Sequence, residues 1–280
     1  MRNKIGIMIE YKRGVNLVER INAAKELGLE SFQLSIWDPT LYTDEEAEVI
    51  RNAIQETGFV MSALWAGWTG PCEWNFNYGP TTIGLVPPAY RFQRVQELLK
   101  ASEFAEKINV TDIITHVGFL PENPDSPDFA GTVGALRYLC KKMQKKGQNF
   151  LFETGQETPV TMLRTIEAIG TDNLGINFDT ANLILYGKAN SVDALEVFGK
   201  YVRNTHIKDG LYPTDGMKLG HETAVGEGKG NIPAVVAKLK ELGYEGHFTI
   251  EREITGEQQI TDIAIAKALL EKTFDELGMN

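Results

Sequence analysis

Short apolar runs and amphipathic segments alternate along the whole chain. Most of the runs are nearly continuous in apolar residues, which is typical of strands buried on both faces of a parallel sheet. They predict strands over residues 4–9, 31–36, 59–65 and 112–117, and four further strands that end at Glu153, Asp179, His206 and Glu251.

The segments between these runs carry the signals of helix starts and ends. Thr43 followed by Glu46 forms a capping box, and Thr158 before Pro159 gives an N-cap followed by a proline at the first helical position. Glycines close several of the segments. The eight predicted helices include residues 15–27, 43–58, 91–107 and 131–146, a segment from 159, and residues 231–243 and 258–277.

Eight strands alternating with eight helices in 280 residues predict an α/β fold, a (β/α)8 TIM barrel. A doubly wound open sheet is the alternative, but it normally has fewer strands. No Gly-x-Gly-x-x-Gly motif follows the first strand, which argues against a dinucleotide-binding fold. Because no linker divides the chain, we expect residues 1–280 to form a single domain.

Composition narrows the range of partners. The chain has 42% hydrophobic residues and a net charge of -10, which disfavours nucleic acid as a partner. The first strand begins too close to the N-terminus for a signal peptide, and no apolar run approaches the length of a membrane span. We therefore expect a cytoplasmic protein that binds a small molecule. The sequence leaves open whether it forms a homo-oligomer.

Four successive strands end on residues that can bind a metal, namely Glu153, Asp179, His206 and Glu251. In a TIM barrel these positions share one rim, where active sites are found. For any one of them, a helix cap or a solvated side chain would be the simpler explanation. The joint pattern predicts one divalent metal ion, with Mn²⁺ favoured and Mg²⁺, Co²⁺ or Zn²⁺ as alternatives. Without the ion, the three carboxylates would repel one another.

The motifs around these residues resemble those of a known superfamily. They are Phe-Glu-Thr at 152–154, Asn-Phe-Asp-Thr-Ala-Asn at 177–182, Thr-His-Ile-Lys-Asp at 205–209, Val-Gly-Glu-Gly at 225–228 and Thr-Ile-Glu-Arg-Glu at 249–253. The chain resembles the sugar phosphate isomerase/epimerase superfamily, the xylose isomerase-like barrels. Its members include D-tagatose 3-epimerase-like enzymes, inosose dehydratases, 3-dehydroshikimate dehydratases and, more distantly, metal-dependent apurinic endonucleases.

The resemblance implies a metal-dependent isomerase or epimerase that acts on a ketose, a keto-sugar or a related polyol. Such enzymes abstract an α-proton and form a metal-stabilised enediolate. By this resemblance, Glu153 and Glu251 are the acid–base pair as well as ligands, whereas Asp179 and His206 are ligands only. A dehydratase of a keto-inositol or similar cyclic ketone is the main alternative.

Two further alternatives are weaker. An apurinic endonuclease of this superfamily needs a multi-zinc site with many histidines and a basic groove, but this chain has four histidines and a net charge of -10. A non-catalytic sugar binder on a degenerate barrel is disfavoured because the ligand set is intact.

The chain departs from the D-tagatose 3-epimerase pattern at two positions. Asn182 stands where those enzymes have a histidine, and no arginine occurs between His206 and Arg252, where they have one. Both departures argue against 3-epimerisation of a free ketohexose. Lys208 lies two residues after His206, on the same strand face. We expect it to bind substrate, or to pair with a neighbouring carboxylate such as Asp209.

The remaining candidate substrate contacts are one histidine and several aromatic residues. His116 ends the fourth strand, and Trp37 follows the second strand and would form a wall of the pocket. Trp65 and Trp68 lie at the start of a long loop, residues 66–89, which is predicted to cover the substrate. In the alternative interpretation, the loop aromatics form a separate hydrophobic cluster or a subunit contact. Together with Asn182 and Lys208, these four residues complete the predicted substrate site.

Overall fold

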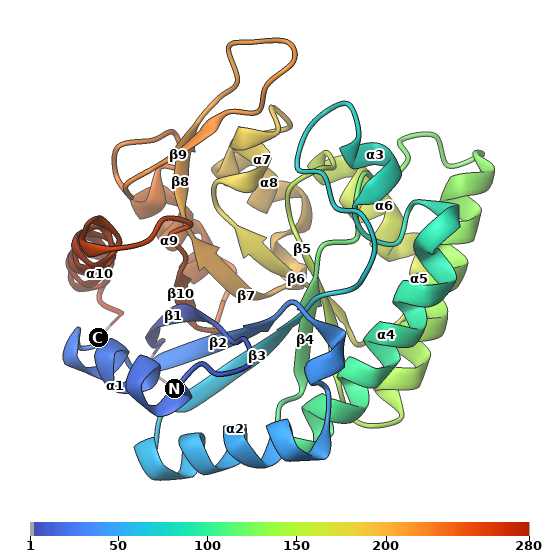
Figure 1. Cartoon of the computed structure of the whole chain (residues 1–280). Helices are drawn as coiled ribbons and strands as arrows, with labels where there is room; N and C mark the ends of the chain where they lie inside the picture. Colours follow the sequence, from blue (N-terminus) through green and yellow to red (C-terminus); the bar gives the residue numbers. More distant parts are fainter. Residues whose placement is uncertain (1–2, 280) are drawn as a thin grey trace.

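The computed structural model describes residues 3–279, which form a closed barrel of parallel strands surrounded by helices (Figure 1). The strands follow one another around the barrel in the order β1-β10-β7-β6-β5-β4-β3-β2, so the predicted (β/α)8 barrel is confirmed. Their bounds are β1 Ile5–Glu10, β2 Ser31–Ile36, β3 Val60–Ala66, β4 Asp112–Thr115, β5 Asn149–Glu153, β6 Leu174–Asp179, β7 Val202–Ile207 and β10 Phe248–Ile250.

The helices form the outer layer, and several begin where the sequence places a capping residue. Thr43 accepts a hydrogen bond from the backbone N–H of Glu46, and Thr158 accepts one from that of Thr161. The helix bounds are α1 Leu17–Glu26, α2 Asp44–Thr57, α3 Gly79–Thr82, α4 Pro88–Lys107, α5 Pro127–Gln144, α6 Pro159–Ile169, α7 Asn182–Leu185, α8 Ser191–Phe198, α9 Ile232–Glu241 and α10 Glu257–Leu277. Two 3₁₀ turns lie at Pro39–Leu41 and Gly199–Tyr201.

Some elements differ from the prediction for local reasons. Helices α4 and α5 begin three and four residues early, at Pro88 and Pro127, because a proline at the first helical turn fixes φ near its helical value. Strand β4 ends at Thr115, so His116 lies just beyond it. The hairpin formed by β8 Asp209–Leu211 and β9 His221–Thr223 was not predicted, because its strands are only three residues long.

The main hydrophobic core lies between the barrel and the helices. Phe104 on α4 and Phe274 on α10 are buried there, as are phenylalanines of the strands such as Phe150, Phe178 and Phe248. A smaller cluster of Ala63, Trp65, Ile114 and Leu151 fills part of the barrel interior. This packing holds the strand ends rigidly, and the candidate site is built on those ends.

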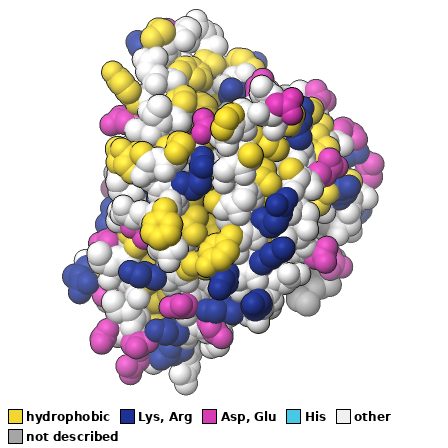
Figure 2. All heavy atoms as spheres, turned by 90° about the vertical axis from the view of Figure 1, so that its right-hand side faces the viewer, with side chains coloured by type: hydrophobic (Ala, Val, Ile, Leu, Met, Phe, Trp, Pro, Cys, Tyr) yellow, Lys and Arg dark blue, Asp and Glu magenta, His cyan; other side chains and the backbone are white. Residues whose placement is uncertain are grey.

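The outer helices leave some large apolar side chains exposed. Figure 2 views the molecule from the side on which α4 and α5 lie, and shows hydrophobic side chains bordered by Lys and Arg. Phe92 on α4, Tyr138 on α5 and Val160 on α6 are exposed. Among the described residues, no helix combines the length and the apolar character needed to cross a bilayer.

Candidate active site

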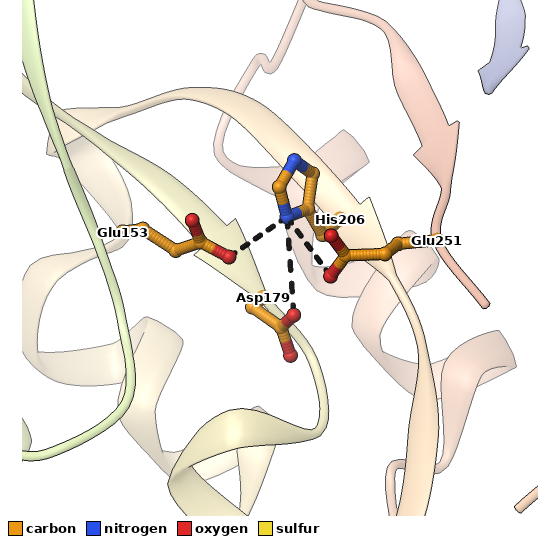
Figure 3. A group of neighbouring side chains, drawn as sticks. All are labelled: Glu153, Asp179, His206 and Glu251. Carbon is orange, nitrogen blue, oxygen red and sulfur yellow. Dashed lines mark hydrogen bonds and ion pairs between the residues drawn. The ribbon is translucent and has the colours of Figure 1, made fainter. Parts of the chain in front are cut away.

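The four predicted metal ligands converge at the carboxyl ends of adjacent strands. Glu153 and Asp179 end β5 and β6, His206 lies near the end of β7, and Glu251 follows β10. One ligand atom from each residue lies within 4.8 Å of the others. His206 Nδ1 is 2.9 Å from Glu153 Oε1, 3.3 Å from Glu251 Oε2 and 3.9 Å from Asp179 Oδ2. Figure 3 shows the four side chains pointing toward one another.

Asp179 shows why this group fits a cation. Its Oδ1 accepts hydrogen bonds from the backbone N–H groups of Ala181 and Asn182, at 2.8 and 2.7 Å. Its Oδ2 is buried and has no hydrogen-bond partner, and burial raises the pKa of Asp179 to about 8. An unpartnered buried carboxylate oxygen is costly. A divalent ion would satisfy this oxygen, so the donor set of three carboxylates and one imidazole can hold a metal.

The two glutamates stay ionised although they are buried. Burial by itself would raise the pKa of Glu251, but the nearby His206 and Lys208 bring this pKa well below its usual value. Burial by itself would also raise the pKa of Glu153, but the nearby His116 and His206 lower this pKa below its usual value. Conversely, burial lowers the pKa of His206, but Glu251 and Glu153 raise it well above 6.5. The negative charge of the site is therefore concentrated around His206 Nδ1.

A glutamine that the sequence analysis missed orients the imidazole of His206. Gln33 on β2 lies across the barrel, with its Oε1 2.7 Å from His206 Nε2. Its Nε2 donates to Asn177 Oδ1 at 3.1 Å. With the hydrogen on Nε2 directed at Gln33, Nδ1 is the nitrogen that would bind a metal ion, in place of the proton that the carboxylates favour there. The available signal was a polar residue in the middle of the apolar run 31–36, fully buried in the structure.

We expect Gln33→Leu to lower the affinity for Mn²⁺ by about 10–100-fold while the barrel stays folded, because the imidazole loses its orienting partner. Calorimetric titration of the metal-stripped variant measures this change. Gln96→Leu on the exposed face of α4 is the matched control and should bind Mn²⁺ like the wild type. Equal affinities for Gln33→Leu and wild type would show that Gln33 has no such role.

The second carboxylate oxygen of Glu153 faces two aromatic side chains. The indole Nε1 of Trp65 donates a hydrogen bond to Oε2, and His116 Nε2 lies 3.5 Å from the same oxygen. Burial lowers the pKa of His116, which favours its neutral form. Two of the predicted substrate residues therefore contact a predicted catalytic group, and both line the cavity described below.

Lys208 is buried beneath the site and forms ion pairs with its carboxylates. Its Nζ lies 2.7 Å from Glu253 Oε1, 3.3 Å from Glu251 Oε2 and 3.7 Å from Asp179 Oδ2, and it donates to Asn182 Oδ1 at 3.3 Å. Among the described residues that line the cavity, Lys208 is not found, whereas Asn182 is. A direct contact of Lys208 with substrate stays a prediction, and its observed role is to hold Glu251.

The ion pair of Lys208 with a neighbouring carboxylate, considered as an alternative from the sequence, is present, but its partners include Glu251 and Glu253 and not Asp209. The Asp209 carboxylate instead accepts hydrogen bonds from the backbone N–H groups of Gly226, Gly228 and Gly230, at 2.8 to 3.1 Å. A Cβ on Gly228 would lie 2.1 Å from Asp209 Oδ1, so only glycine allows this close approach. Asp209 therefore organises the glycine-rich turn before α9.

A cavity of about 620 Å³ opens at the site and is lined by two of the four ligand residues, Glu153 and Glu251. This volume lies within the range of small-molecule sites. One wall is aromatic, because the Trp37 ring stacks on Trp65 at 5.0 Å and Trp74 lies 5.0 Å from the ring of His116. The cavity is also lined by Gln156, Asn182, Tyr186, Glu251, Arg252 and Glu253, of which Asn182 and Glu251 were predicted as site residues and the other four were not.

Trp68 was expected from the sequence to contact the substrate, but it is not among the described residues that line the cavity. Its side chain is buried, its Nε1 donates to Thr115 Oγ1 at 3.1 Å, and its ring lies 5.2 Å from that of Trp37. Among the described residues, the loop contributes Trp74 to the cavity lining instead. Trp68 therefore supports the aromatic wall from behind.

Glu157, four residues after Glu153, has a second carboxyl group whose charged form is disfavoured by burial. It is buried, its Oε1 accepts from the N–H of Gly155 at 3.2 Å, and its Oε2 has no partner. Burial raises its pKa from 4.5 to about 7. Because the folded chain binds this proton more tightly than the unfolded chain, stability falls as pH rises from about 4.5 to about 7.

We therefore expect Glu157→Gln to stabilise the protein at pH 8, by on the order of 2 kcal/mol, and to have little effect at pH 4.5. Thermal melts at both pH values measure the difference. Glu167→Gln on the exposed face of α6 removes the same charge and should change neither melt. A stabilisation of Glu157→Gln that is the same at both pH values would contradict the assigned cause.

Comparison with known proteins places the chain in a family. The family model described as xylose isomerase-like TIM barrel matches residues 21–272. The chain belongs to this family. A crystal structure of a xylose isomerase domain protein from Planctomyces limnophilus is similar over 99% of both chains, with 34% identity and a TM-score of 0.92.

More distant similarities include two proteins whose names state an activity. An uncharacterized protein from Methanocaldococcus jannaschii is 27% identical over 66% of this chain, and inosose dehydratase from Lacticaseibacillus casei is 24% identical over 57%. The matches span 65% and 54% of these relatives, less than two thirds of either. The crystal structure of 3-keto-D-glucoside 4-epimerase from E. coli covers 97% of this chain and 100% of its own, with 18% identity and a TM-score of 0.73, which indicates a shared fold.

Proposed function

We propose that this protein is a metal-dependent isomerase or epimerase of a keto-sugar, a ketose or a related polyol. The observation that carries the proposal is the position of Glu153 and Glu251 on one candidate metal site at the floor of a cavity. The aromatic wall formed by Trp37, Trp65 and Trp74 supports a sugar substrate. Aromatic faces pack well against the apolar C–H faces of a sugar ring and exclude water.

The chemistry follows from the state of the two glutamates. A divalent ion held by Glu153, Asp179, His206 and Glu251 would supply Lewis-acid polarisation of a carbonyl, which acidifies the adjacent C–H bond. Glu251, kept ionised by His206 and Lys208, accepts the proton from this carbon. Glu153 takes up a proton from water on Oε2, close to His116 Nε2, and delivers it to the opposite face, while Glu251 later releases its proton to water. One proton leaves and one arrives, so the product is an isomer of the substrate.

A lyase is the second candidate, favoured by the similarity to inosose dehydratase. It begins with the same proton abstraction by Glu251. Glu153 would then protonate a β-hydroxyl group that leaves as water, in place of the carbon. Both reactions use the same residues, so the product distinguishes them.

A panel of keto-sugars, ketoses and inososes incubated with the protein and Mn²⁺ in D₂O tests the proposal. An epimerase or isomerase gives a product of unchanged heavy-atom composition, with deuterium at the α-carbon. A dehydratase gives a product lighter by one water molecule. The absence of both turnover and α-deuterium exchange across the panel would contradict the proposed function.

A further inference from the structure

The segment between β3 and α4, residues 67–87, forms part of the aromatic wall and is called the wall loop below. It is tied down by Arg94, a fully buried residue on α4. The guanidinium donates to four backbone carbonyl oxygens of the loop: Nη1 to Thr82 at 2.6 Å and to Gly84 at 2.7 Å, Nη2 to Pro71 at 2.8 Å, and Nε to Thr69 at 3.1 Å. One side chain therefore fixes points that span most of the loop.

The surroundings of Arg94 include aromatic rings and backbone carbonyl groups of the wall loop. Its guanidinium lies 4.0 Å from the ring centroid of Trp68 and 4.8 Å from that of Tyr90. No carboxylate of the described residues forms an ion pair with it within 4.0 Å. Burial lowers its pKa to about 10, so it remains charged at neutral pH. A buried cation without an ion pair is costly unless charge-assisted hydrogen bonds offset the loss of water, and here four carbonyl groups do so.

The loop clamped by Arg94 leads directly to the candidate active site. Trp68 packs against Trp37, which stacks on Trp65, and Trp65 donates to Glu153. Trp74, farther along the loop, packs against both Trp37 and His116. A displacement of the loop would therefore move the aromatic wall and the groups that contact Glu153.

The end of the wall loop has no room to move as a lid. The N–H of Leu85 donates to the carbonyl of Val117 at 2.8 Å. Gly84 has a φ of 70°, and a Cβ at this position would lie 2.2 Å from the carbonyl carbon of Val117. The loop was expected from the sequence to cover the substrate, but these contacts fix it against the residues that follow β4.

We propose that Arg94 is a positioning residue of the active site, which holds the wall loop as a fixed aromatic wall. The part of this inference that concerns substrate binding rests on the proposed sugar-converting function. Lysine cannot replace Arg94, because one ammonium group has three donors and lacks the planar fork that reaches four carbonyls.

Arg94→Lys keeps the buried charge, and Arg94→Gln removes it, so the two variants separate charge from geometry. All four tryptophans of the sequence form this wall or pack directly behind it, so tryptophan fluorescence reports on this region. We expect acrylamide quenching to rise roughly twofold or more in both variants, with faster hydrogen exchange confined to residues 67–87. Lys100→Met, on the exposed face of α4, is the control and should leave both signals unchanged.

The same Arg94 variants also distinguish an effect on substrate binding from an effect on metal binding. Mn²⁺ affinity should stay at the wild-type value, because Arg94 contacts none of the four ligand residues. For an identified substrate, we expect KM to rise roughly tenfold with a smaller change in kcat, the sign of a lost binding contact. Quenching and exchange need no substrate, so they test the clamp even if the proposed function is wrong.

Unchanged quenching and exchange in both Arg94 variants would overturn the proposal. So would accelerated exchange throughout β5 and β6, or failure of both variants to fold, because Arg94 would then support the barrel core and not the wall loop.

Discussion

Replacement of Glu251 by glutamine is expected to lower kcat by about 10²–10⁴ while the barrel stays folded, because the amide cannot accept the substrate proton. Glutamine keeps the size of the side chain and an oxygen in reach of the metal. The buried Lys208, which lies 3.3 Å from Glu251 Oε2, keeps a polar partner there. Steady-state kinetics, with circular dichroism as the test of folding, measures the loss.

Glu253→Gln is the matched control for this experiment. Glu253 also pairs with Lys208, at 2.7 Å, but it is not one of the four candidate ligands. Each variant replaces one carboxylate that pairs with Lys208 by a neutral amide, so a general electrostatic effect on this lysine would appear in both. We expect a much smaller loss for Glu253→Gln. Wild-type kcat in Glu251→Gln would show that Glu251 is not the base.

Asp179→Asn is expected to remove metal binding and turnover together. The asparagine Oδ1 can still accept the N–H groups of Ala181 and Asn182, so the local fold of the loop is kept. The oxygen that lacks a hydrogen-bond partner in the structure is replaced by a neutral NH₂ group, which cannot bind a cation. We expect the affinity for Mn²⁺ to fall at least roughly 10²-fold, equivalent to about 3 kcal/mol.

The stability of the metal-free proteins adds a second signature for Asp179→Asn. Burial makes the charged form of Asp179 unfavourable, so the neutral variant should melt at the same or a higher temperature than metal-free wild type. Saturating Mn²⁺ should raise the melting temperature of wild type and leave that of the variant unchanged. A variant that is stabilised by Mn²⁺ as much as wild type would contradict the ligand assignment of Asp179.

The barrel and the ligand set could be predicted because both follow from local order in the sequence. Buried parallel strands read as apolar runs, and the residue at which a run ends lies at the barrel rim whatever the neighbouring strands contain. Glu153, Asp179, His206 and Glu251 each occupy such a position, and the structure brings them together. Helix starts were less exact, because the prolines at 88 and 127 were not used as first-turn residues.

The support around the ligands could not be predicted, because it depends on contacts between distant parts of the chain. Gln33 contacts His206 only after the barrel closes, and the residues around Gln33 in the sequence do not indicate that His206 is its partner. Arg94 reads as an ordinary cation on an amphipathic helix, yet it is buried against backbone carbonyls that carry no sequence signature. Trp68 and Trp74 lie in one loop, and only tertiary packing decides which of them lines the cavity.

Titration of the metal-stripped wild-type protein with Mn²⁺, followed by calorimetry and checked by elemental analysis, tests the central claim most directly. The convergence of Glu153, Asp179, His206 and Glu251 predicts one tightly bound ion per chain, and activity that a chelator removes and Mn²⁺ restores. No saturable binding of Mn²⁺ or of any other divalent ion, or turnover that is unaffected by chelation, would contradict the account.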